Sequence, residues 1–176
     1  STYKPEVLIQ RSNSLLMPGL IDCHCHMELS LLRGLAQDTS KWMMYGLGPF
    51  KKHLTDNDLR EGFLLGVIEA LATGTTTYGE YGYQMHDIAA DIEKIGIRGH
   101  LTQLVTEVKD EIYQPGELYA FDDGLGDYNV KRMLDLFDRW ESRANGRIHV
   151  LFGPQGPDFL SRERLLEIRK LAIERG

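Results

Sequence analysis

Short segments that are apolar or rich in β-branched residues alternate with helical apolar stripes, and this alternation constrains the fold of the chain most. The segments of strand character are 15–26, 75–80, 97–106 and 147–152. Apolar residues recur at helical spacing within 59–71, 86–95, 130–140 and 165–172. Strands that alternate with helices in this way are typical of a parallel sheet with crossover helices.

Residue types at the predicted helix ends agree with this assignment. Thr55 followed by Asp58 resembles a capping box at the start of the first helix. Gly96 stops the second helix, and Ser161 is a typical N-cap of the last one.

The acidic run 122–127 lacks the ligand spacing of a calcium loop, and we interpret it as a solvated loop. Glu80, just after the predicted second strand, is interpreted as a loop or helix-capping residue.

The number of strand–helix units predicts half of a barrel. A complete eight-unit barrel takes about 250 residues, so the 176 residues here hold about four units. A doubly wound sheet is an alternative, but no glycine-rich phosphate fingerprint follows any strand. The sequence therefore predicts an α/β fold in which residues 15–176 form the first four units of a TIM-type (β/α)8 barrel. Residues 1–14 are predicted to end a preceding small β segment, and we expect the chain to be part of a longer polypeptide.

Composition excludes several classes of protein. The net charge is −6 and the sequence pI is about 5.5, which argues against a broad nucleic-acid or anionic-membrane surface. No apolar run approaches the roughly 20 residues of a membrane helix. Cys23 and Cys25 are one residue apart, a spacing unsuited to a disulfide. A cytoplasmic location is therefore expected.

The sharpest chemical signal is the pair His24 and His26 at the end of the first predicted strand. Side chains on a regular strand alternate between its faces, so both imidazoles are expected on one face, with Cys23 and Cys25 on the other. At the carboxyl end of a barrel strand that face is the mouth where active sites lie. Two neutral imidazoles there can bind one divalent metal ion such as zinc or iron. The pattern is equally compatible with two surface histidines on an edge strand.

Several motifs in order resemble the amidohydrolase superfamily, in particular its deaminase and chlorohydrolase branch. The matching segments are 18–26 (PGLIDCHCH), 32–34 (LRG) with Asp38 and Trp42, 74–77 (GTTT), and 153–154 (GP) with Pro157, Asp158 and Ser161. The resemblance implies that His24 and His26 are metal ligands for zinc, iron or another divalent ion. It also implies hydrolytic deamination or dechlorination of a small heterocycle by the full-length protein.

The resemblance also implies that the site is incomplete within this chain. The family's remaining ligands and its proton-shuttling glutamate belong to later strands, so catalytic residues are expected after residue 176 and none is assigned here. Catalytic zinc sites normally have three protein ligands. We therefore expect the segment alone to bind zinc weakly and to lack hydrolase activity.

Three positions at which the chain departs from nucleoside-type deaminases are assigned to substrate binding. Gln155 stands where those enzymes carry a histidine after Gly-Pro, Lys51 where they carry a carboxylate, and Gln103 where they carry an arginine. The position of Lys51 is equally compatible with a solvated lysine outside the site. These changes alter charge and hydrogen-bonding capacity, which argues against an adenosine-like substrate.

Two other functions remain open. A half-barrel has two unpaired strand edges, so the chain is alternatively a non-catalytic unit that associates with itself. A metal-dependent phosphoesterase or nuclease of the same superfamily is also possible, although the GTTT and GP motifs argue against it. Expected partners are a heterocyclic small molecule and either further copies of the chain or a missing carboxyl-terminal half, with no nucleic acid or membrane.

Overall fold

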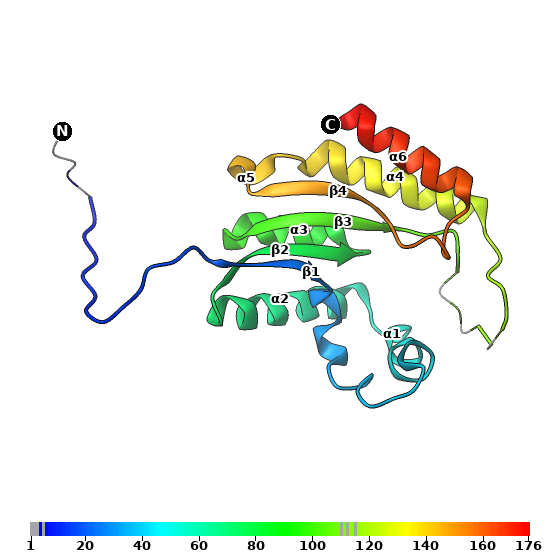
Figure 1. Cartoon of the computed structure of the whole chain (residues 1–176), viewed down its shortest axis with the longest axis horizontal. Coiled ribbons are helices and arrows are strands. Elements are labelled where there is room, and N and C mark those ends of the chain that lie inside the picture. Colours follow the sequence, from blue (N-terminus) through cyan, green and yellow to red (C-terminus); the bar gives the residue numbers. More distant parts are fainter. Residues whose placement is uncertain (1–3, 5, 110, 112, 115) are drawn as a thin grey trace.

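Four parallel strands form one sheet in the order β1-β2-β3-β4, and helices connect each strand to the next (Figure 1). The computed structural model describes residues 4, 6–109, 111, 113–114 and 116–176. The elements are β1 (Leu20–Cys25), η1 (Met27–Leu32), η2 (Met43–Leu47), α1 (Gly48–Lys51), α2 (Asp56–Ala72), β2 (Thr75–Gly82), α3 (Met85–Ile95), β3 (Arg98–Val105), α4 (Asp123–Trp140), α5 (Arg143–Gly146), β4 (Ile148–Pro154) and α6 (Arg162–Arg175). This arrangement confirms the predicted α/β fold and the four strand–helix units.

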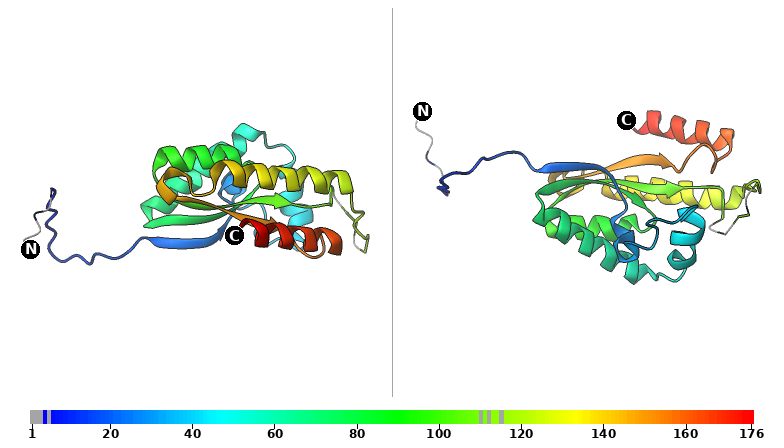
Figure 2. Two further views of the ribbon diagram at one scale, coloured as in Figure 1. Left: turned by 90° about the horizontal axis from the view of Figure 1, so that it is seen from above. Right: turned by 60° about the horizontal axis from the view of Figure 1, so that its bottom comes forward.

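The core lies between one face of the sheet and the helices. Tyr78, Leu101 and Ile148 of the strands are fully buried in one apolar cluster with side chains of α2, α3 and α4. A second cluster joins Val105 of β3 to buried residues of α4 and α6. Further views in Figure 2 show helices packed along the curved sheet. The opposite face is more open, since Leu151 of β4 is 49% exposed. In a barrel that face is the interior.

The predicted caps are confirmed, with one correction. Thr55 and Asp58 form the reciprocal capping box of α2, Gly96 ends α3 in the left-handed conformation, and the Ser161 hydroxyl accepts from the N–H of Arg164. The interpretation of 122–127 as a solvated loop is wrong. Asp122 caps α4 by accepting from the N–H of Leu125, and the following residues form the first turn. An aspartate at this position satisfies a backbone donor that would otherwise lack a partner.

β1 contains a bulge next to β2. Asp22 pairs with Tyr78 and Cys25 pairs with Glu80, so Cys23 and His24 lie opposite the single residue Gly79. A Cβ added to Gly79 would lie 2.4 Å from the Cys23 carbonyl oxygen, which no real side chain tolerates. The strand is therefore not the regular one that simple alternation assumes. Bulges re-aim the side chains that follow them.

The amino-terminal residues contribute little to the described fold. Residues 6–14 form no strand in this structure and run away from the sheet (Figure 1). Residues 1–3 and 5 lie outside the described residues, so the assignment of 1–14 to a preceding β segment stays a prediction. Among the helices that the structure describes, none combines the length and apolarity needed to cross a membrane.

Candidate metal centre

His24 and His26 lie together at the carboxyl end of β1. Their ring centroids are 4.9 Å apart and the ring planes are nearly perpendicular, at 87°. Tyr81 of β2 contacts both, with centroid distances of 5.9 Å to His24 and 5.6 Å to His26. Cys25 points the other way, and its thiol donates to Glu80 Oε2 at 3.1 Å. The bulged strand thus presents both imidazoles on the open face of the sheet.

The protonation of His26 suits a metal ligand. Its Nδ1 lies 2.7 Å from the carbonyl oxygen of Tyr81. Because a carbonyl can only accept, Nδ1 carries the proton in the neutral ring, and Nε2 keeps its lone pair. Loss of solvation lowers the pKa of His26; His24 and Lys51 lower it further, while the Tyr81 carbonyl acts in the opposite sense. The net shift favours neutral imidazole, the form that binds metals.

Two of the predicted substrate residues lie at the same end of the sheet. Lys51 ends α1, and its ammonium lies 4.9 Å from the centre of the Tyr83 ring, just beyond β2. Its charge acts on both His26 and Glu28. Gln155 follows β4 directly, and its N–H donates to the Val105 carbonyl at 2.9 Å. Both residues are half-buried, next to the strand ends at which His26 lies.

Gln103 takes a different position. It pairs with Gly82 in the regular part of β3 and is fully buried, on the same face as Leu101 and Val105. That face is covered by helices, whereas Tyr81 and the imidazoles lie on the other. Neither the amide nitrogen nor the amide oxygen of Gln103 has a hydrogen-bond partner among the described residues. The structure therefore does not bring Gln103 together with His24 and His26.

A buried acidic pair lies behind the imidazoles and was missed by the sequence analysis. Glu80 is 0% exposed and Glu28 is 2% exposed, so the interpretation of Glu80 as a loop or capping residue is wrong. The Glu28 carboxylate occupies the space where a Gly82 side chain would be. One oxygen of each carboxylate has no partner among the described residues. Only the alternation Tyr78–Glu80–Gly82 along β2 signals this burial in the sequence.

The pKa of Glu80 is raised to about 8, mainly by burial and also by the nearby Glu28, against the hydrogen bond from Cys25. Burial also raises the pKa of Glu28, to about 6, against the charge of Lys51. Carboxyls that are forced to stay protonated in the folded state but ionise in the unfolded chain make folding stability depend on pH. Their contribution is fully present below the unfolded pKa, near 4.3, and is lost as the pH rises through the folded value.

The free energy of unfolding is therefore expected to fall between pH 4.5 and 8, by up to about 1.4 kcal/mol per pH unit from Glu80. Glu80→Gln is expected to flatten this dependence, since the amide does not ionise. Urea unfolding at several pH values measures it. Glu163→Gln on exposed α6 is the control and should keep the parent slope. An unchanged slope in Glu80→Gln would contradict a buried neutral carboxyl.

The donor set fits part of a zinc site. Two imidazoles, one of them with its tautomer fixed, are suitable zinc ligands. Within the described residues no group of three or more His, Cys, Asp or Glu side chains could hold a metal ion. The described residues thus offer two candidate ligands, one fewer than catalytic zinc sites usually take from the protein.

Known proteins show the same sequence pattern and fold. The chain is 33% identical to a 5′-deoxyadenosine deaminase of Methanobrevibacter smithii, over 95% of this chain and 36% of that protein. It is 33% identical to a 5-methylthioadenosine/S-adenosylhomocysteine deaminase of Caldanaerobacter subterraneus, over 98% of this chain and 38% of that protein. The chain therefore spans little more than a third of the length of these relatives.

Solved structures share the fold. A zinc-bound adenosine deaminase from Xanthomonas campestris matches with a TM-score of 0.73 and 24% identity, over 90% of this chain and 34% of that one. A zinc complex of atrazine chlorohydrolase from Arthrobacter aurescens matches with a TM-score of 0.71 and 19% identity, over 89% and 38%. Both matches confirm a partial TIM-type barrel. The sequence model of the amidohydrolase family matches residues 15–176, and the chain belongs to that family.

Proposed function

We propose that this chain is part of a metal-dependent hydrolase that removes an amino group or a halide from a small heterocycle. The observation that carries the proposal is the imidazole pair, held 4.9 Å apart at the carboxyl end of β1. Relatives named as deaminases, at 33% identity, support the reaction class. Substrates and activity belong to the complete protein, because the chain spans only 36% and 38% of these relatives.

His24 and His26 would hold the metal, for which zinc is our first candidate and iron or another divalent ion the alternative. A bound ion of this kind supplies activated water near neutral pH. His26 would bind through Nε2, because its Nδ1–H is engaged with the Tyr81 carbonyl. The remaining ligands and the residue that moves protons are expected from strands after residue 176.

Lys51 and Gln155 are proposed to face the substrate. The Lys51 ammonium, which lies over the Tyr83 ring, places a positive charge close to His26. Gln155 offers an amide that both donates and accepts. Both groups can donate hydrogen bonds to the electron-rich ring atoms of a flat heterocycle. A direct role for Gln103 would require its side chain to leave the helix-covered face.

Replacing a metal ligand tests the proposal. His26→Asn in the complete zinc-loaded protein is expected to reduce turnover by more than the 10- to 100-fold typical of losing an outer-shell partner, because an imidazole donor itself is lost. Release of ammonia or chloride is measured on aminopurines, aminopyrimidines and chlorinated triazines, with adenosine nucleosides expected to be poor substrates. His100→Asn is the control, because the His100 ring stacks on His149 rather than on His24 or His26.

The same assay separates the other candidates. Hydrolysis of a phosphodiester with no deamination or dechlorination would favour the phosphoesterase alternative. Absence of any turnover and of bound metal, together with a dimeric or larger mass, would favour a self-associating half-barrel, since β1 and β4 each pair on one side only within the described sheet. The free thiols of Cys23 and Cys25 agree with the cytoplasmic location that we propose.

A further inference from the structure

We propose that Tyr81 is a positioning residue for the imidazole pair. Its main-chain carbonyl fixes the tautomer of His26, and its ring sets the relative placement of the two imidazoles. The inference deepens the proposed function and rests on it for the identity of the metal ligands.

The main chain of Tyr81 accounts for the tautomer. Tyr81 is part of β2 and pairs with Thr102 of β3, so strand pairing anchors its backbone. Its carbonyl oxygen lies 2.7 Å from His26 Nδ1 and can only accept a hydrogen bond. A neutral imidazole that donates from Nδ1 offers Nε2 to a metal ion, and such a partner also restrains rotation of the ring.

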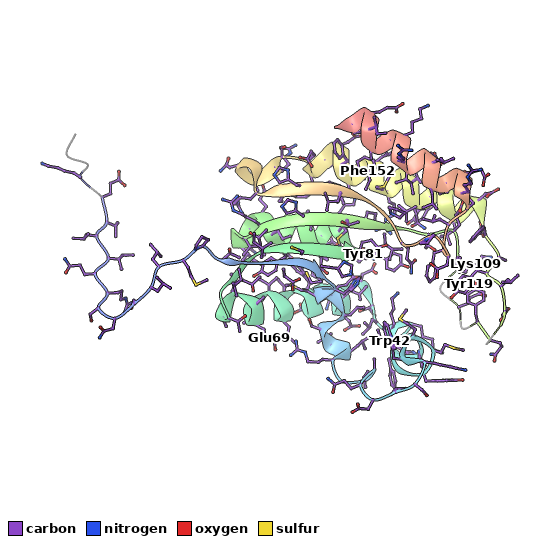
Figure 3. The ribbon with its side chains drawn as sticks, viewed as in Figure 1. Trp42, Glu69, Tyr81, Lys109, Tyr119 and Phe152 are labelled. Atoms are coloured by element: carbon purple, nitrogen blue, oxygen red, sulfur yellow. The ribbon has the colours of Figure 1, made fainter. Side chains whose placement is uncertain are left out.

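The side chain of Tyr81 accounts for the packing of the pair. Its ring meets the His26 ring at 69° and the His24 ring at 30°, so one aromatic surface contacts both imidazoles. On the β4 side, a Cβ on Gly153 would lie 3.1 Å from Tyr81 Cε2. The ring therefore lies between the imidazoles and a glycine that leaves room for it. Figure 3 shows Tyr81 near the carboxyl ends of the strands.

The hydroxyl group of Tyr81 is not needed for the contacts that its ring makes with the two imidazoles. Tyr81 Oη is buried and has no hydrogen-bond partner among the described residues. Removing an unsatisfied buried hydroxyl costs no hydrogen bond, so Tyr81→Phe should keep the function of the ring. Tyr81→Leu keeps the apolar volume in part but loses the flat surface that both imidazoles contact.

Two measurements test the proposal. Long-range ¹H–¹⁵N correlation spectra of the metal-free complete protein report the tautomer of His26, which is expected to carry its proton on Nδ1. Competition with a chromophoric chelator measures zinc affinity, and Tyr81→Leu is expected to weaken it by about 10- to 100-fold. The absorption spectrum of bound Co²⁺ should change in the same variant, whereas Tyr81→Phe should resemble the parent in both assays.

Tyr128→Leu, an exposed tyrosine of α4, is the matched control and should bind zinc like the parent. A proton on Nε2 of His26, or parent-like zinc affinity and Co²⁺ spectrum in Tyr81→Leu, would overturn the inference. If the parent protein binds no zinc, the proposed function fails, and the tautomer alone then decides whether the Tyr81 carbonyl positions His26.

Discussion

Gly79→Ala is expected to lower the free energy of unfolding by about 3 kcal/mol, the upper end of what overpacking usually costs, and to weaken metal binding in the same protein. The new methyl group would lie 2.4 Å from the carbonyl oxygen and 2.7 Å from the carbonyl carbon of Cys23. Both contacts are with backbone, so no side-chain rotation relieves them. β1 must then move away from β2 at the bulge that carries His24.

Denaturant unfolding and zinc competition measure the two effects. Gly124→Ala in the first turn of α4 is the matched control, since its methyl group would meet a side-chain oxygen of Asp122 at 3.3 Å rather than backbone. That variant should stay within about 0.5 kcal/mol of the parent. Equal stability of Gly79→Ala and the parent would show that β1 does not need the close approach at the bulge.

Arg164→Ala is expected to destabilise the fold by about 3–5 kcal/mol, because it leaves a buried carboxylate without its cation. The guanidinium of Arg164 donates to Glu107 at 3.1 Å, to Asp127 at 2.7 Å and to Glu167 at 2.7 Å. The side chain of Glu107 is only 1% exposed. Burial alone would raise the pKa of Glu107, but the N–H of Ser161 and the guanidinium of Arg164 outweigh burial and lower it.

This network joins the segment after β3 to the start of α6, so its loss should loosen the loops at the carboxyl ends of β3 and β4. Thermal and denaturant unfolding measure the loss. Arg162→Ala, an exposed arginine on the same helix, is the control. The double variant Arg164→Ala with Glu107→Gln should recover part of the stability, because the unpaired charge is gone. Full additivity of the two changes would contradict direct coupling.

Much of the fold follows from local signals. The capping box at Thr55, the cap at Ser161 and the glycine at position 96 are short-range features. As predicted, the first two begin helices and Gly96 ends one. The start of α4 was misassigned because acidic residues around Asp122 suit a solvated loop as well as a helix amino terminus. What distinguishes a solvated loop from a helix amino terminus here is that the following turns pack against β3. A local sequence pattern carries no information about that packing.

The sequence by itself determined the alternation of strands and helices, the order of the motifs and the pair His24 and His26, because these depend on residue types at short spacing. Only the tertiary structure decided how the pair is held. The bulge opposite Gly79, the Tyr81 carbonyl at His26, the burial of Glu80 and the face occupied by Gln103 all depend on the pairing of strands from distant parts of the chain. Strand register places each of these groups, and register is a property of two strands together, not of either one alone.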